Sequence, residues 1–436
     1  MSTYRRHHRN GVARVVLSLL VAYLSLLMAS PAFAAQPRDL PRAVSPEAEG
    51  IDPKALEKLL EEAKASHSSA VVILKNGKLI GEWTFGKPST RIEAMSVTKS
   101  VVGMGVVKLL ADGKIPSLDV PVHQYFPEWN QGRKKDITLR HLLNHTSGID
   151  VGGPGTGEIY QSPDFVRLAL AAELAHAPGT QLQYNNKAVN LLAAIVEKAS
   201  GKRMDRYFGD AFFRPMGITD YSWTLDKAGN PHAMSGLQIQ PRDLAKLGQL
   251  LVDGGMWHLR QLLPQEWVKR MLAPGEGPAV GTGLLWWPEN AWHRYFVDEV
   301  LLSTWKQAGV PQPLIQAATA LLGRDFQDRD TYLDALGVPL PEFQKEIMGR
   351  NQKPWRVETG PLVGAQANGW LGQYLVVLPE QRLVAVRMYD YPEDTKGEAP
   401  PADSFGTFIL RVKELVHVGP PPVGEATQTQ GSASPR

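Results

Sequence analysis

The chain has 436 residues, of which 43% are hydrophobic and 21% charged, a balance that is typical of folded globular proteins and excludes disorder as the default interpretation. Its 47 basic and 44 acidic residues give a formal charge of +3, with no basic run that indicates nucleic acid as a partner. The absence of cysteine excludes disulfides, thiolate metal sites and a cysteine nucleophile.

The first 34 residues have the features of a secretory signal peptide. Four arginines precede an apolar run over residues 15–29, and small residues surround Ala34, after which we expect cleavage. The run is shorter than the roughly 18 residues typical of a spanning helix, so an uncleaved membrane anchor is the less favoured alternative. Cleavage leaves 43 basic and 44 acidic residues. We therefore expect a periplasmic or secreted protein without stable membrane insertion.

The predicted elements place strands towards both ends of the chain and helices in the middle. Asp52-Pro53 is typical of a helix start, and Asn76-Gly77 predicts a tight hairpin between two strands. Apolar spacing predicts four further helices, then a second strand pair and a closing helix. The expected strands span 70–74, 79–85, 372–379 and 382–389, and the expected helices begin near 53 and span 96–112, 183–200, 241–253, 264–272 and 405–416.

This order predicts an α+β fold, in which an antiparallel sheet built from both chain ends is flanked by helices and carries an inserted helical lobe. The cleft between sheet and lobe is the expected site. We place one domain at residues 35–417. Within it, residues 290–356 form a charged, aromatic-rich insert that does not fit the compact plan. Residues 418–436, rich in Pro, Gly, Ser, Thr and Gln, are expected to be a disordered tail.

Ser96-Val-Thr-Lys99 is the first candidate for chemistry, because this spacing at a helix start puts a hydroxyl and an amine on one face of the first turn. The small, apolar residues around it predict burial, which lowers the pKa of a lysine and lets it accept the proton of a serine. A capping serine beside a solvated lysine is the alternative. Ser303-Thr-Trp-Lys306 matches the same pattern within the insert, where we expect no catalytic role.

Tyr184-Asn185-Asn186 is the second candidate, a polar loop tip directly before a predicted helix. A tyrosinate there would shuttle protons between Ser96 and a leaving group, and Asn186 would hydrogen-bond the lysine and the substrate. Capping and packing are the alternative roles.

The order and spacing of these segments resemble the serine beta-lactamase-like family, which includes class C beta-lactamases, D,D-peptidases, esterases and 6-aminohexanoate-dimer hydrolases. The segment from Ile137 to Ile149, which contains His-Thr-Ser-Gly, and Pro178-Gly-Thr180 extend the resemblance. It implies the penicillin-recognising fold, Ser96 as the acylated nucleophile, Lys99 as base or helper of the base, and Tyr184 as second proton carrier. Which of the two takes the first proton stays open. No metal or organic cofactor is implied.

The family's third element, Lys-Thr-Gly or His-x-Gly on a strand beside the cleft, corresponds here to Ala367-Asn368-Gly369, which has no cation. In relatives that cation helps to hold a substrate carboxylate, so its absence disfavours beta-lactams and D-Ala-D-Ala peptides. The resemblance also implies that the backbone N–H groups of Ser96 and Trp370 form an oxyanion hole. Trp370 and Tyr374 are expected to shape an apolar acyl pocket, and an aromatic that only covers the sheet is the alternative for Trp370.

Two further patterns do not predict function. His141 and His145 have the spacing of a zinc helix, but Leu142 stands where a metalloprotease carries its glutamate, so we expect no metal. Residues 152–157 share only their glycines with a phosphate loop.

We therefore predict an exported serine hydrolase that acts on small-molecule esters or amides through an acyl-enzyme. A beta-lactamase or D,D-peptidase is the enzymatic alternative, and a non-catalytic binding protein on the same fold is the alternative of another class. The intact set of Ser96, Lys99 and Tyr184 disfavours the binding protein. The oligomeric state stays open.

Overall fold

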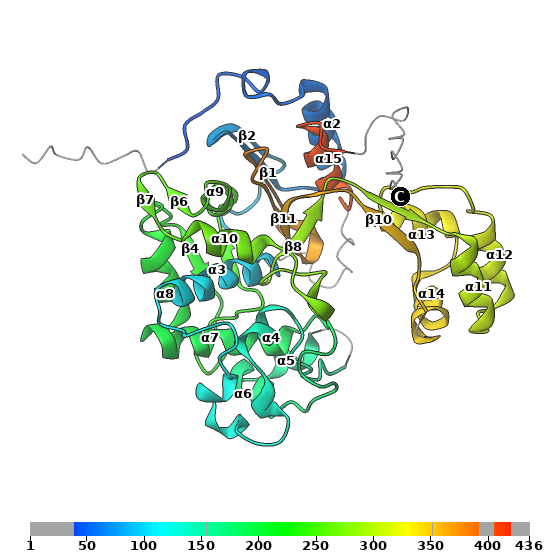
Figure 1. The fold of residues 1–436 in the computed structure, drawn as a ribbon. Helices are drawn as coiled ribbons and strands as arrows, with labels where there is room; N and C mark the ends of the chain where they lie inside the picture. Colours follow the sequence, from blue (N-terminus) through cyan, green and yellow to red (C-terminus); the bar gives the residue numbers. More distant parts are fainter. Residues whose placement is uncertain (1–38, 154–155, 351, 392–404, 420–436) are drawn as a thin grey trace, which may run out of the picture. The chain divides into compact units, whose positions relative to one another are not determined.

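A six-stranded antiparallel sheet organises the residues that the computed structural model describes, 39–153, 156–350, 352–391 and 405–419 (Figure 1). The predicted signal peptide and almost all of the predicted tail lie outside these residues. The strand order β2-β1-β13-β12-β11-β8 combines early and late parts of the chain, which confirms the predicted α+β sheet. Its strands are β1 (Ala70–Lys75), β2 (Lys78–Thr84), β8 (Trp287–Asn290), β11 (Leu362–Gly369), β12 (Gln373–Leu378) and β13 (Leu383–Met388).

The central strands are mostly hydrophobic because helices cover both faces of the sheet. In β1, Val72 and Leu74 join one buried cluster, and Val71 and Ile73 join a second cluster on the opposite face. The predicted hairpin forms at Asn76 and Gly77, both with positive φ (55° and 75°), which is the backbone of a two-residue turn.

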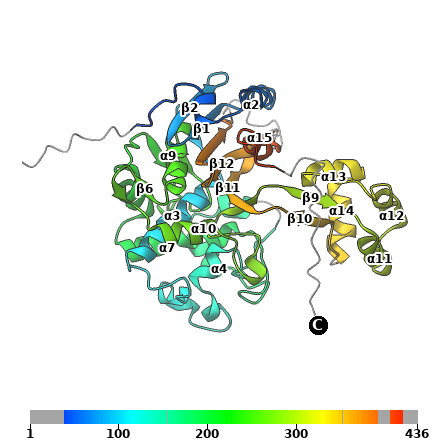
Figure 2. The same ribbon diagram turned by 45° about the horizontal axis from the view of Figure 1, so that its top comes forward.

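Helices α2 (Pro53–Ala65) and α15 (Phe408–Glu414) lie side by side on one face of the sheet, and α9 (Pro241–Val252) packs on the other (Figure 2). Asp52 caps α2 by accepting hydrogen bonds from the N–H groups of Lys54 and Ala55. No helix within the described residues combines the length and apolar character needed to cross a membrane.

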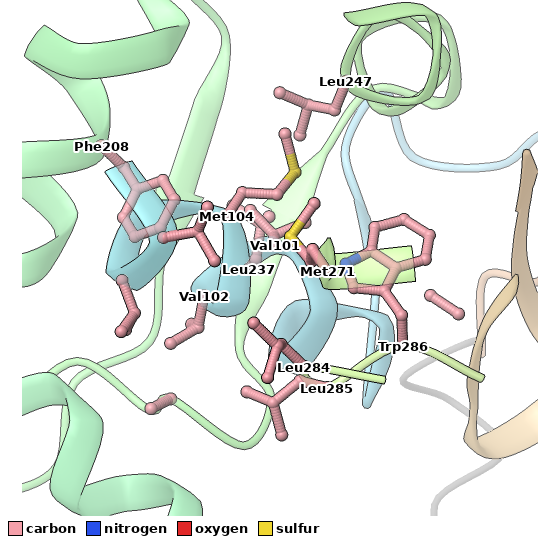
Figure 3. Packing of buried hydrophobic residues seen from close by; sticks show 14 of the residues in the cluster. Val101, Val102, Met104, Phe208, Leu237, Leu247, Met271, Leu284, Leu285 and Trp286 are labelled. Carbon is pink, nitrogen blue, oxygen red and sulfur yellow. The ribbon is translucent and has the colours of Figure 1, made fainter. Parts of the chain in front are cut away.

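Helix α3 (Val97–Ala111) is the centre of the larger buried cluster (Figure 3). Thirteen of its fifteen residues are buried, so it has no solvent-facing side and its first turn is held on all sides. A Cβ atom added at Gly103 would lie 2.8 Å from the Leu284 carbonyl, and one at Gly105 would lie 2.3 Å from the Phe208 ring. These glycines let neighbouring segments approach the helix that carries the first candidate motif.

The remaining elements range from two-residue strands to a 15-residue helix. They include α4 (Leu139–Leu143), α5 (Gly157–Gln161), α6 (Phe165–Ala171), α7 (Asn186–Ser200), α8 (Met204–Phe208) and α10 (Gln265–Leu272), together with strands β3 (Ile92–Glu93), β4 (Tyr221–Trp223), β5 (Leu237–Ile239), β6 (Met256–Trp257) and β7 (Arg260–Gln261).

The region between β8 and β11 folds around a hydrophobic cluster of its own, whose largest members are Trp305, Tyr332 and Phe343. The ribbon of β9 (His293–Phe296) and β10 (Arg356–Thr359) joins it to the sheet strands. Its helices are α11 (Glu299–Gln307), α12 (Gln312–Thr319), α13 (Arg329–Leu336) and α14 (Leu340–Glu346). The sequence predicted short helical patches here, but neither the ribbon nor the separate core.

Candidate active site

Ser96 occupies the N-cap position of α3, yet its side chain makes no capping hydrogen bond. An N-cap serine normally accepts from a backbone N–H in the first turn. Here the Ser96 Oγ instead lies 2.9 Å from the Lys99 Nζ and 2.8 Å from the Tyr184 hydroxyl. The preceding residue, Met95, has a φ of +47°, an unfavourable conformation of the kind that clusters at functional sites. The capping interpretation of Ser96 therefore does not describe this serine.

Lys99 lies in the first turn of α3 and is only 3% exposed. Its Nζ donates to the carbonyl of Met234 (2.7 Å) and to Ser96 Oγ, and within the described residues no carboxylate pairs with it. Burial lowers the pKa of Lys99 well below its usual value. The amine is thus disposed to be neutral and to accept the serine proton.

Tyr184 ends the loop before α7, and its hydroxyl donates to Ser96 Oγ. Tyr184 is 39% exposed, and its ring lies against the buried lysine, whose Nζ is 4.9 Å from the ring centroid. Burial raises the pKa of Tyr184 to about 12, and the hydrogen bond to Ser96 opposes this shift. The phenol is therefore protonated at rest, which favours Lys99 as the acceptor of the first proton.

Two aromatic side chains, His145 and Trp287, pack against the ring of Tyr184. The buried His145 ring lies 4.7 Å from the Tyr184 ring, and Trp287 of β8 stacks on both at 6.1 and 6.2 Å. The Nδ1 of His145 accepts from the N–H of Asn185, and burial is the main cause that lowers the pKa of His145 to about 3. Neutral His145 thus packs against the site. Among the residues that the structure describes, no cluster of three potential metal ligands occurs.

Sequence reasoning missed the segment that holds the lysine. The side-chain oxygen of Asn190, on α7, accepts from the N–H groups of Ala233 and Met234, both at 3.1 Å. The same Met234 then presents its carbonyl to Lys99. Asn190 is 1% exposed, and no local pattern reveals it, because its partners lie more than forty residues away.

Asn368 and Gly369 end strand β11 and approach the start of α3. A Cβ atom added at Gly369 would lie 2.9 Å from the Ser96 backbone nitrogen. Trp370 begins the turn into β12, is 56% exposed, and is not part of a sheet strand. Within the described residues, the N–H groups of Ser96 and Trp370 donate to no backbone acceptor. Both are the donors that the resemblance assigns to an oxyanion hole.

A pocket of about 420 Å³ brings most of the predicted site residues together, and no charged side chain of the described residues lines it. Its lining residues are Ser96, Tyr184, Trp287, Asn368, Gly369, Trp370 and Tyr374. Lys99 lies behind Ser96 and does not line the pocket, and neither does Asn186. Asn186 is half-buried in the first turn of α7 and makes no side-chain hydrogen bond among the described residues, whereas its neighbour Asn185 caps the helix.

The family model named Beta-lactamase matches residues 56–402, which is most of the chain. The chain belongs to this family. Its members share the serine beta-lactamase and transpeptidase-like fold, and the chain has this fold.

Curated relatives match only part of the chain. Protein flp of Staphylococcus aureus strain MRSA252 is 26% identical over 189 residues, which cover 39% of this chain and 38% of that protein. A candidate penicillin-binding protein, PbpX of Bacillus subtilis strain 168, is 24% identical over 250 residues, which cover 50% of this chain and 61% of that protein. The chain thus spans less than two thirds of either relative.

Solved structures share the fold over most of the chain. A candidate beta-lactamase from Bacteroides dorei has a TM-score of 0.57 at 18% identity, covering 84% of this chain and 99% of that one. A candidate 6-aminohexanoate-dimer hydrolase from Bacillus anthracis has a TM-score of 0.55 at 17% identity, covering 84% and 83%. At these identities the likeness establishes the fold alone.

Proposed function

We propose that this protein is a serine hydrolase that acts on carboxylic esters or small amides, including linear oligoamides, through an acyl-enzyme at Ser96. The observation that carries the proposal is the position of Ser96 Oγ, which is hydrogen-bonded both to a buried lysine and to a tyrosine at the wall of an open pocket. A binding protein has no need of a nucleophile in this arrangement.

The proposed reaction begins when neutral Lys99 takes the Ser96 proton and Oγ attacks the carbonyl carbon. The negative charge that develops on the carbonyl oxygen is stabilised by the N–H groups of Ser96 and Trp370. Tyr184 then protonates the leaving group and regains a proton from Lys99, which leaves an ester of Ser96. Water attacks this ester, its proton passes to Lys99, and Ser96 leaves with that proton.

The lining of the pocket favours substrates without a carboxylate beside the reacting carbonyl. Ala367 stands where the family resemblance expects a cation, and no charged side chain of the described residues lines the pocket. Trp287, Trp370 and Tyr374 provide apolar surface for an acyl group. Beta-lactam or D,D-peptide hydrolysis is the alternative within the same mechanism, and it needs a carboxylate partner from elsewhere.

We also propose that the protein is exported. This rests on residues 1–34, whose basic and apolar segments are typical of a signal peptide and lie outside the described residues.

The test is intact-mass spectrometry of the protein without residues 1–34 after exposure to a fluorophosphonate probe, followed by p-nitrophenyl ester turnover. The expected result is one adduct that disappears in Ser96→Ala and persists in Ser303→Ala, together with ester turnover. Rapid nitrocefin hydrolysis in place of ester turnover would shift the assignment to a beta-lactamase. The absence of any adduct would contradict the proposal and favour a binding protein.

A further inference from the structure

Arg387, on strand β13, is a fully buried guanidinium at 0% exposure. A charged group without hydrogen-bond partners is costly to bury, so its partners indicate why it is kept there. The guanidinium lies over the ring of Tyr389, with 5.9 Å between the guanidinium carbon and the ring centroid.

The guanidinium joins two backbone segments that are distant in sequence. Its Nη1 donates to the carbonyls of Leu371 (2.5 Å) and Gly372 (2.8 Å), in the turn between β11 and β12. Its Nη2 donates to the carbonyl of Ser66 (2.9 Å), and its Nε donates to the Ser68 hydroxyl (2.9 Å). The rigid fork of an arginine can fix several acceptors at once, which a lysine cannot do.

The turn that Arg387 grips has an unfavourable backbone. Leu371 has φ +66° and ψ 14°, and Gly372 follows with φ +73°. A leucine in this left-handed region is strained, and it persists only where its surroundings hold it. The two carbonyls that accept from Nη1 belong to these two residues.

The same turn begins at the reacting end of the pocket. Gly369 lies against the Ser96 backbone nitrogen, and Trp370 lines the pocket and offers an N–H without a backbone acceptor among the described residues. We propose that Arg387 is a positioning residue that holds residues 369–372 so that the Trp370 N–H points at the developing oxyanion. This inference rests on the proposed acyl-enzyme function. Because the oxyanion exists only in the transition state, a loosened turn lowers kcat and leaves KM nearly unchanged.

The main test is Arg387→Lys, which keeps the charge but removes the fork. We expect kcat for a p-nitrophenyl ester to fall about 10- to 100-fold with KM within about twofold, since one displaced oxyanion donor has effects of this order. Arg382→Lys is the matched control. Arg382 directly precedes β13, is half-exposed and pairs with Asp253 at 3.1 Å, so the kcat of this variant should equal that of the wild type.

A second substitution separates positioning from general destabilisation. Glycine adopts positive φ without strain, so Leu371→Gly in the Arg387→Lys background should recover kcat about fivefold or more while the melting temperature stays low. An unchanged kcat in folded Arg387→Lys would overturn the proposal, as would a kcat that tracks the melting temperature in both variants.

If Arg387→Lys does not fold, Ser68→Ala takes its place. Ser68 contacts Arg387 on the side away from the pocket, so a fall in kcat of about two- to fivefold is expected and an unchanged kcat overturns the inference. A wild-type protein that no fluorophosphonate labels would instead contradict the proposed function itself. Labelled wild type with an unaffected Arg387→Lys contradicts only the positioning role.

Discussion

Ser96-Val-Thr-Lys99 and Ser303-Thr-Trp-Lys306 follow one sequence pattern but occupy two different environments. Ser96 stands at the start of the buried helix α3, where its hydroxyl meets a lysine and a tyrosine. Ser303 lies on the exposed side of α11, and its hydroxyl accepts from Gln307 at 3.4 Å, while Lys306 is exposed. Burial and a third partner from a distant loop, rather than the spacing, distinguish the reactive pair.

The largest expected effect separates the two lysines. Lys99→Met removes the proton acceptor, and kcat/KM for a p-nitrophenyl ester should fall about 10⁴-fold or more. Lys306→Met should leave kcat/KM within about twofold of the wild-type value, because the Lys306 amine is exposed to solvent and takes no part in the proposed reaction. Steady-state kinetics on both variants checks the contrast, and equal losses would mean that the first pair has no special role.

The next effect concerns the approach of β11 to Ser96, which has no counterpart at Ser303. A methyl group at Gly369 would lie 2.9 Å from both the Ala94 carbonyl and the Ser96 nitrogen, so Gly369→Ala should lower kcat about 100-fold. Gly281→Ala is the matched control, because an added Cβ there meets nothing within 4 Å. Circular dichroism must confirm that both variants are folded before a difference in kcat is interpreted.

The third prediction concerns the stability of the fold at acid pH, which depends on the buried His145. Burial is the main cause that lowers the pKa of His145 from 6.5 to about 3, so His145 stays neutral in the folded state where it becomes protonated in the unfolded state. Stability is therefore lost as the pH falls from 6.5 towards 3, by about 1.4 kcal/mol per unit at most. His145→Asn should reduce the loss between pH 6.5 and 4.5 by about 2 kcal/mol in urea denaturation. Identical slopes in the wild-type protein and His145→Asn would contradict the burial argument.

The smallest expected effect is a gain in stability. Lys99 is buried without a carboxylate among the described residues, so Lys99→Met should raise the melting temperature by about 1–3 °C even as activity disappears. Lys306→Met should not change it. Differential scanning fluorimetry measures both, and a lower melting temperature for Lys99→Met would mean that its two hydrogen bonds outweigh the desolvation cost.

Local patterns in the sequence predicted the elements that have strong local signals. Helix α3, the Asn76-Gly77 hairpin and the β12 and β13 pair all appear close to their predicted bounds, because apolar periodicity and turn residues act over a few positions. The motifs also predicted that Ser96, Lys99 and Tyr184 would share a site, and the structure brings these three side chains together.

Long-range contacts account for what the sequence analysis missed. Trp287, Asn190 and Arg387 contribute to the site only because strands and loops from elsewhere meet them, and no spacing rule marks them. Strand β11 is rich in glycine and alanine, and its local pattern predicted no strand, so only the family resemblance indicated one at Ala367-Asn368-Gly369. Asn186 took its predicted role from its place at a polar loop tip beside Tyr184, whereas in the structure it does not line the pocket.

The ribbon of β9 and β10 connects the sheet to the region between β8 and β11, which has a hydrophobic cluster of its own. Asn290 and Leu362 are paired neighbours in the sheet, so the chain departs and returns within about 5 Å, the spacing of opposite residues on adjacent strands. A short reverse turn of a few residues has the same span. The segment between β8 and β11 could therefore be replaced by a short turn or by another small domain without changing the path of the chain through the six-stranded sheet.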